Sequence, residues 1–235
     1  MRISSLLILL IGAFCFITGC TKQDLQALDL KDSYYPLQVG KYIIYDVDST
    51  VYDEFSQSSY LHQFQVKMLV ADTFRDSNMK LNYRYERYTR ENSKQAFQLA
   101  DVWSATQQNG RVEVVEENQR FIKYIYPPVL GNSWKGNAYI KADLNDPRSK
   151  FLGNWDYSFT AVDQPFDLKG TTYDSTIVIL ENGELIPQVE SSNFKTIYAK
   201  HIGPIYAKRE YLEKQPSDLT WQSGFSVEYR INSHN

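Results

Sequence analysis

Two carboxylates in the first quarter of the chain are the residues best spaced for acid–base chemistry. Asp46 and Asp48 lie two residues apart in a segment with strand character, so their side chains are expected on one face. Paired carboxylates are the machinery of glycoside hydrolysis, one acting as an acid and the other as a base or nucleophile. Exposed carboxylates are also common on strands, so we keep a glycosidase-like hydrolase as the alternative interpretation.

Other catalytic patterns lack their partners. The histidines, His62, His201 and His234, are far apart in the sequence, and none has a second ligand at metal spacing. Ser77–Lys80 and Ser192–Lys195 match the serine–lysine pattern of acyl enzymes, but no Lys-Thr-Gly occurs in the chain. We therefore predict no catalytic residue, no metal site, no cofactor and a protein that is not an enzyme.

Cys20 is the one residue with a clear chemical setting. The apolar run Leu6–Ile17 is too short to span a bilayer as a helix, which needs about 20 residues. It ends in Ile17-Thr18-Gly19-Cys20, which resembles a bacterial lipobox. The resemblance implies cleavage before Cys20 and acylation of its thiol, with two or three acyl chains giving a stable membrane anchor.

The chain divides accordingly into three parts. Residues 1–19 are expected to be a lipoprotein signal peptide, 20–33 a polar lipidated tether and 34–235 a β-rich domain. Thr21 follows the lipidated position in place of aspartate, which in enteric-type sorting implies the outer membrane. We favour an envelope location facing the periplasm over one on the cell surface.

Composition excludes several other classes of protein. The chain has 235 residues, of which 43% are hydrophobic and 23% charged, and this is typical of a globular domain. Its net charge of -3 offers no basic field for nucleic acid. We therefore expect a membrane partner through Cys20 and an unidentified protein, glycan or lipid ligand, but no nucleic acid.

The dominant hydrophobic period of the domain is two, which indicates antiparallel strands. It is clearest over residues 63–70, 81–90, 157–161 and 225–231. We predict a mainly β fold made of a single curved antiparallel sheet, either barrel-like or a sandwich, with one or two short helices at 143–153 and 217–221. The dipeptides Asn109-Gly110 and Asn182-Gly183 predict hairpin turns, because both residue types accept positive φ.

Tyrosine is unusually frequent, with 18 residues beside 12 phenylalanines. Aromatic rings can line an apolar cavity or stack on sugars, while the hydroxyl supplies a hydrogen bond. Tyrosine is also simply a good strand residue. If two tyrosine-rich strands face one cleft, the ligand-binding residues are expected to be Tyr83, Tyr85, Tyr124 and Tyr126.

Two segments are similar to motifs of small envelope lipoproteins common in the Bacteroidota. Tyr35–Tyr45 resembles their Y-P-L-x-V-G start motif, and Phe194–Ile205 resembles a later motif of the same class. The resemblance implies an envelope location and a β-rich domain, and it implies no catalytic residue. We therefore predict a lipid-anchored envelope protein with a non-enzymatic binding domain, the alternatives being the carboxylate hydrolase and a structural subunit of an outer-membrane complex.

Replacing Cys20 by serine tests the anchor. Serine has no thiol to accept diacylglycerol, so Cys20→Ser is expected to move the protein from the membrane fraction to the soluble fraction. Intact-mass analysis of both proteins checks the modification. A membrane-extracted wild-type chain that carries an unmodified Cys20 contradicts the prediction.

Overall fold

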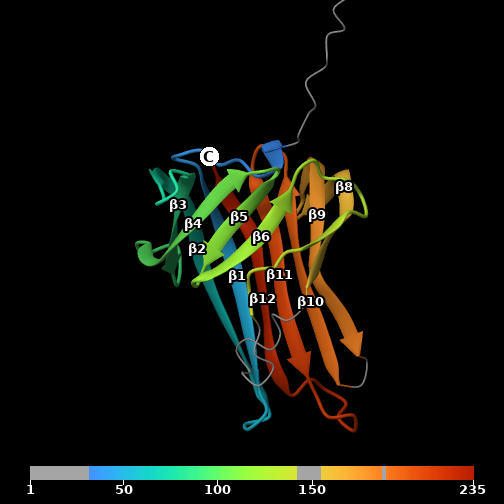
Figure 1. Ribbon diagram of the computed structural model, residues 1–235. Coiled ribbons are helices and arrows are strands. Elements are labelled where there is room, and N and C mark those ends of the chain that lie inside the picture. The colour runs from blue at the N-terminus through green and yellow to red at the C-terminus, as the bar shows by residue number, and fades with distance from the viewer. Residues whose placement is uncertain (1–31, 142–154, 187–188) are drawn as a thin grey trace, which may run out of the picture.

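Twelve antiparallel strands form one sheet that is nearly closed into a barrel (Figure 1). The computed structural model describes residues 32–141, 155–186 and 189–235. The described elements are a short 3-10 helix η1 (Asp32–Tyr34) and the strands β1 (Tyr42–Asp53), β2 (Ser58–Arg75), β3 (Leu81–Arg90), β4 (Gln98–Gln108), β5 (Arg111–Glu116), β6 (Gln119–Ile125), β7 (Ser133–Lys135), β8 (Asp156–Leu168), β9 (Thr171–Ile186), β10 (Glu190–Ala199), β11 (Gly203–Glu213) and β12 (Ser223–His234). The prediction of a mainly β fold with a single antiparallel sheet is confirmed.

The sheet consists of two meanders that are joined by pairing between the first strand, β1, and the last strand, β12. Strands β1 to β6 pair in sequence order, as do β7 to β12, and β1 pairs with β12. The two remaining edges, β6 and β7, approach each other. Ile122 N donates to Gly136 O at 2.7 Å, and the Trp134 indole donates to Ile122 O at 2.8 Å. These contacts bring the edges together and leave a protected interior.

Aromatic side chains fill much of this interior. Tyr124 on β6 packs against Phe159 on β8, with ring centroids 5.6 Å apart, and against Tyr198 on β10 at 5.9 Å. Trp134 on β7 lies 4.9 Å from Phe159. Burying a large apolar side chain contributes roughly 1.5–3 kcal/mol. The aromatic cluster thus joins strands that are far apart in the sheet order, which opposes opening of the barrel.

One predicted hairpin turn is confirmed and the other is wrong. Asn109 and Gly110 have φ of 51° and 73° and connect β4 to β5. Asn182-Gly183 lies instead within β9, which pairs with β10 through both residues. The register shifts there, and Glu181 is the extra residue of a β-bulge. The Asn-Gly signal therefore marks an irregularity of a long strand and not its end.

The two short helices predicted from the sequence have different outcomes. Residues 217–221 form part of the loop between β11 and β12, so the helix expected there is wrong. Asp218 N donates to Gln215 O, and Gln215 N donates to the Asp218 carboxylate, which closes a turn around Pro216 in place of a helix. The helix expected at 143–153 lies outside the described residues. Within the described ranges, no helix has the length and hydropathy needed to cross a membrane.

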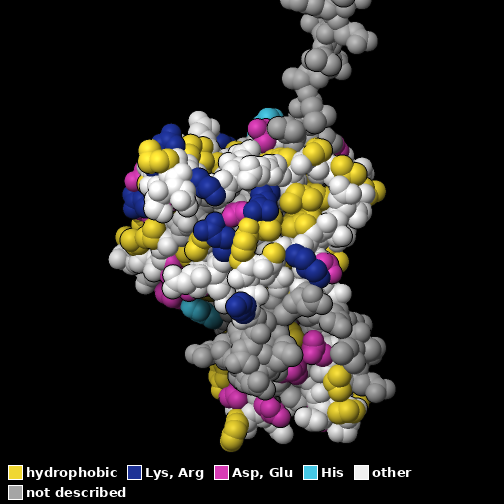
Figure 2. All heavy atoms as spheres, viewed as in Figure 1, with side chains coloured by type: hydrophobic (Ala, Val, Ile, Leu, Met, Phe, Trp, Pro, Cys, Tyr) yellow, Lys and Arg dark blue, Asp and Glu magenta, His cyan; other side chains and the backbone are white. Residues whose placement is uncertain are grey.

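Basic side chains gather on the outer face of β4 to β6 (Figure 2). Two of them, Arg111 and Arg120, share the carboxylate of Glu113, which is only 2% exposed. Burial raises the pKa of Glu113, but the two arginines outweigh burial and hold the pKa below its usual range. These arginines are thus partly neutralised by an acidic partner beneath them.

Gly136, beside the barrel seam, offers a test of closure. A Cβ at this position would lie 2.3 Å from the ring of Tyr157, which is fully buried. Gly136→Ala is therefore expected to lower the free energy of unfolding by about 1–3 kcal/mol through overpacking. Urea unfolding measures it, with Ser133→Ala at an exposed position of β7 as the control. Equal stability of the two variants contradicts the packing described here.

Candidate functional site

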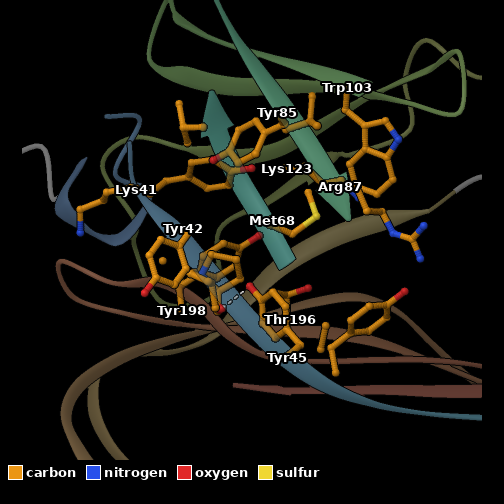
Figure 3. Close-up of a pocket in the computed structure, with 18 of the residues that line it drawn as sticks. Lys41, Tyr42, Tyr45, Met68, Tyr85, Arg87, Trp103, Lys123, Thr196 and Tyr198 are labelled. Atoms are coloured by element: carbon orange, nitrogen blue, oxygen red, sulfur yellow. Dashed lines mark hydrogen bonds between the residues drawn. The ribbon is translucent and has the colours of Figure 1, made fainter. Parts of the chain in front are cut away.

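A cavity of about 220 Å³ lies between the two meanders of the barrel (Figure 3). Its walls come from β1 to β6 on one side and β10 to β12 on the other, together with residues 35–41 that precede β1. Most of the lining is aromatic or aliphatic: Tyr35, Pro36, Tyr42, Ile43, Tyr45, Met68, Val70, Tyr85, Trp103, Val114, Tyr198, Ile202, Pro204, Ala207 and Tyr229. Such a chamber suits the apolar part of a small molecule.

Tyrosine hydroxyls give the apolar wall its hydrogen-bonding groups. Burial raises the pKa values of Tyr35, Tyr45 and Tyr198 well above the ordinary value, so these phenols stay protonated at any physiological pH. Tyr45 donates to the backbone carbonyl of Pro204 at 2.7 Å. The ring of Tyr35 lies 5.7 Å from that of Tyr198. The hydroxyls therefore act as neutral donors or acceptors and not as bases.

A charged cluster lies at one side of the cavity. Arg209 on β11 and Lys123 on β6 line the cavity, and so do Glu116 and Thr196. Lys123 forms an ion pair with Glu116. Arg209 pairs with Glu181 at 2.9 Å and donates to the Thr196 hydroxyl at 2.9 Å, while that hydroxyl donates to Glu181 at 2.6 Å. The cluster offers fixed polar atoms beside a mainly apolar wall, which also includes Lys41 and Arg87, the latter paired with Asp101.

The bulge in β9 lies beside this cluster. Glu181 shares a face with Ile177 and Ile179 and is 2% exposed. Burial raises the pKa of Glu181, but attraction to Arg209 and Lys123 outweighs burial, so the pKa lies below its usual range. Burial likewise disfavours the charge on Arg209, and Glu181 overcomes that effect and raises its pKa. Both groups are therefore charged at neutral pH.

Next to the pair, the side chain of Tyr157 is fully buried. Burial raises its pKa, and the field of Glu181 adds to that shift, so the hydroxyl stays protonated. This neutral hydroxyl interacts with the Glu181 carboxylate and helps to hold the pKa of Glu181 down. Tyr157 therefore belongs to the polar cluster as a neutral neighbour of the ion pair.

Of the four tyrosines predicted as ligand-binding residues, one lines the cavity and the others occupy different positions in the barrel. Tyr85 lines the cavity. Tyr83 is two residues along the same strand and pairs with Ala105. Tyr124 is fully buried in the aromatic cluster, and the ring of Tyr126 lies 4.8 Å from it. The hydroxyl of Tyr126 is buried without a described partner. Ligand contact by any of the four stays a prediction.

The two segments noted for their resemblance meet at this cavity. Tyr35–Tyr45 supplies part of one wall and Phe194–Ile205 supplies part of another. Lys41 Nζ donates to His201 O at 2.6 Å, and a Cβ on Gly203 would lie 3.5 Å from Ile43 and 3.6 Å from Pro36. Gly203 has a φ of 107°, which favours glycine at this close approach. Both segments can be noted from the sequence, but the sequence alone does not identify their side chains as the lining of one cavity.

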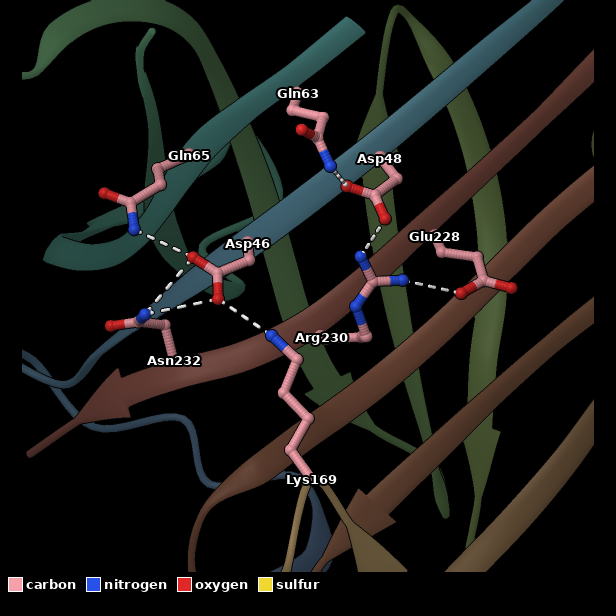
Figure 4. Close-up of polar contacts among 8 residues, drawn as sticks. All are labelled: Asp46, Asp48, Gln63, Gln65, Lys169, Glu228, Arg230 and Asn232. Atoms are coloured by element: carbon pink, nitrogen blue, oxygen red, sulfur yellow. Dashed lines mark hydrogen bonds and ion pairs between the residues drawn. The ribbon is translucent and has the colours of Figure 1, made fainter. Parts of the chain in front are cut away.

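The carboxylates considered for hydrolysis share one strand face, and both are bonded to neighbours (Figure 4). Asp46 accepts hydrogen bonds from Gln65 and Asn232 and pairs with Lys169 at 2.9 Å. Asp48 pairs with Arg230 and accepts from Gln63. Burial raises both pKa values, but these partners together outweigh burial and lower the pKa values below the ordinary range. The two groups therefore stay ionised and tie the β8–β9 hairpin and β12 to β1.

The three histidines lie in different elements. His62 contacts Glu91 at 2.7 Å, His201 lies in the turn before β11, and His234 is at the end of β12. Within the described residues, no group of three or more His, Cys, Asp or Glu side chains is arranged to hold a metal ion.

Comparison with known proteins gives limited information. No protein-family model and no curated protein sequence matches the chain. Among solved structures, the chain is similar to a candidate lipoprotein from Parabacteroides distasonis, with a TM-score of 0.40 and 9% identity over 86% of this chain and 98% of that chain. It is also similar to a DUF1329 family protein from Desulfovibrio piger, with a TM-score of 0.22 and 8% identity over 88% of this chain and 90% of that one. Neither similarity assigns a ligand or an activity.

The Glu181–Arg209 pair yields a stability prediction. Glu181→Gln leaves the Arg209 charge buried without its partner and is expected to lower the free energy of unfolding by about 3 kcal/mol at pH 7. The double variant Glu181→Leu with Arg209→Met removes both charges and should recover most of that loss. Urea unfolding of the three proteins measures both effects. Equal destabilisation by the single and double variants contradicts the pairing.

The pH dependence of that difference has a defined sign. The folded pKa of Glu181 lies below the unfolded value of about 4.3, so its stabilisation is complete above that pH and is lost as pH falls through the folded pKa. The stability gap between wild type and Glu181→Gln should therefore be constant from pH 7 to pH 5 and shrink in more acidic solution. A gap that widens below pH 4 is inconsistent with a depressed pKa.

Proposed function

We propose that this chain is a lipid-anchored envelope protein whose barrel binds a small amphipathic molecule in its interior cavity. The observation that carries the proposal is the convergence of Tyr35–Tyr45 and Phe194–Ile205 on that cavity. A chamber with aromatic walls and a polar cluster on one side suits a ligand with an apolar body and a polar end. The barrel holds both parts of such a ligand out of water.

The binding proposed here is non-enzymatic. Catalysis by carboxylates would need a group free to exchange protons with a substrate. The carboxylate that lines the cavity, Glu116, is ion-paired with Lys123, and the pKa values of Asp46 and Asp48 are shifted away from neutrality. The chemistry of the cavity therefore favours holding a molecule over transforming it.

The cellular setting that we propose is supported by the lipobox-like segment that ends at Cys20. Acylation of Cys20 would attach the chain to the membrane, and residues 20–33 would act as a spacer before the barrel. With Thr21 after the lipidated cysteine, we place the protein in the outer membrane, facing the periplasm. A binding barrel on a lipid tether would hold its ligand close to the membrane surface.

Filling the cavity tests the proposal. Ala207 lines the cavity and lies between Thr196 and Tyr229 on the neighbouring strands. Ala207→Phe places a ring in the chamber and is expected to reduce binding of 1-anilinonaphthalene-8-sulfonate, an amphipathic fluorescent probe, by about tenfold or more, which is about 1.4 kcal/mol. The uncharged probe N-phenyl-1-naphthylamine, titrated in parallel, measures the contribution of the charged cluster.

A matched substitution controls for added surface hydrophobicity. Ala100→Phe introduces the same ring at an exposed position of β4 and should leave probe affinity unchanged. Mass spectrometry of organic extracts from wild type and Ala207→Phe, both purified from the envelope, would then identify the natural ligand as a species lost from the variant. Unchanged probe affinity in a folded Ala207→Phe protein refutes the cavity as the binding site.

A further inference from the structure

A second hollow lies at the far end of the molecule from η1 and the C-terminus. The tip of the β1–β2 hairpin and the loop between β11 and β12 both reach this end (Figure 1). Residues from the two tips line a cleft of about 370 Å³. No described residue lines both the interior cavity and this cleft. The two sites can therefore bind independently.

Strand pairing fixes the position of the cleft. Tyr52 on β1 pairs with Ser59 on β2 and with Gly224 on β12, so it links the two tips. Gly224 has a φ of 116°, and a Cβ there would lie 2.0 Å from Tyr211 O. Glycine is therefore required where β12 approaches β11, immediately after the loop that carries Trp221. The cleft is part of the sheet framework.

The loop that carries Trp221 is held by its own hydrogen bonds. Gln222 N donates to Glu213 O at 2.9 Å, and the Gln222 amide donates to Thr220 at 3.2 Å. Lys214 Nζ lies 5.4 Å from the centroid of the Trp221 ring and donates to Asp218 O. A cation over an aromatic face stabilises the orientation of the ring. Trp221 is thus positioned before any ligand arrives.

The described lining of the cleft consists of aromatic, hydroxyl and amide side chains. Two half-buried aromatic side chains, Tyr52 and Trp221, accompany neutral hydroxyl and amide groups, and none of the described residues that line the cleft is charged. Aromatic rings stack on the C–H faces of sugar rings, while hydroxyls and amides can both donate to and accept from sugar hydroxyls. The nearby Lys214 ammonium is already engaged by the Trp221 ring and by Asp218 O, and a long acyl chain would find too little apolar wall.

Two of the neutral groups are available to a ligand. The side chains of Gln57 and Ser59 make no hydrogen bond within the part of the chain that the structure describes, while Ser58 bonds to Ser56 at 2.7 Å. Gln57 has a φ of 48°, a region that glycine or asparagine enters more easily. A long amide therefore occupies a turn position where a smaller residue would fit the backbone better.

We infer that this cleft binds a neutral saccharide, with Trp221 and Tyr52 against the sugar rings and Gln57 and Ser59 on the sugar hydroxyls. The site faces away from the end at which the described chain begins, residue 32. A barrel anchored through that end would present the cleft outward from its membrane. The inference rests on the cleft alone and holds whether or not the interior cavity is occupied.

Titration with oligosaccharides tests the inference. The full-length lipidated protein, in a zwitterionic detergent without a sugar headgroup, is screened on an array of neutral and uronic-acid-containing oligosaccharides. Calorimetry then gives Kd for the neutral oligosaccharide with the strongest signal. Trp221→Ala is expected to weaken binding about tenfold or more, and Trp221→Phe, which keeps a ring, to weaken it less. Gln57→Gly relieves the backbone and is expected to weaken binding while leaving the fold at least as stable.

Matched controls separate this site from general effects. Phe74→Ala truncates an exposed aromatic side chain on β2 outside the cleft and should leave Kd unchanged. Ala207→Phe should also leave it unchanged, so failure of the cavity proposal and failure of this one are distinguishable. Three results overturn the inference: no binding of any neutral oligosaccharide at millimolar concentration, equal binding of acidic ones, or an unchanged Kd in folded Trp221→Ala.

Discussion

The interior depends on the approach of the two sheet edges, β6 and β7. A sheet of this size with open edges would expose rows of unpaired backbone groups and would leave its inner face in water. The seam is short, because β7 has three residues, yet it has both a backbone bond between Ile122 and Gly136 and the indole bond of Trp134. Aromatic packing behind the seam adds contacts between Trp134, Phe159 and Tyr124. Closure therefore combines a few polar contacts at the edge with a large apolar cluster.

Closure also explains why charges can lie inside. Once the barrel excludes water, an ion such as Arg209 is tolerated only with a close partner and further hydrogen bonds. Glu181 and Thr196 meet that requirement for Arg209, and Glu116 meets it for Lys123 in the same cluster. A chamber that served only for packing could be filled by apolar side chains at lower cost. The retained polar atoms are consistent with recognition of a polar group on a ligand.

The strands could be predicted from the sequence, whereas the direction of their side chains could not. Alternation over Leu81–Arg90 correctly indicates a strand, but one of its faces carries Tyr83, Tyr85 and Arg87 and the other Asn82, Arg84 and Glu86. The face with the two tyrosines also carries a charged arginine, so periodicity alone does not say that this face lines a barrel. Tyrosine frequency pointed to Tyr85, which lines the cavity.

Other parts of the site depend on non-local geometry. Tyr45 lies on β1, whereas Tyr198 and Arg209 lie on β10 and β11, and the β1–β12 pairing brings these two meanders together. The bulge at Glu181 follows from the register of β9 against β10, and the nearby Asn-Gly was mistaken for a turn because local propensity carries no register. The two similar segments were the available signal, but without the fold nothing indicates that Lys41 reaches His201.

The long hairpins give the molecule two unlike ends. Near η1 and the C-terminus, strands from both meanders enclose an interior whose polar groups are mostly charged and paired. At the other end, β1, β2, β11 and β12 continue to tips that carry neutral polar side chains around Tyr52 and Trp221 (Figure 1). Because β1 and β12 run through both regions and pair along most of their length, a substitution that shifts their register would alter both sites at once. Side-chain substitutions at either end leave the backbone pairing intact, so the two binding properties should be separable by point mutation but not by changes at the β1–β12 junction.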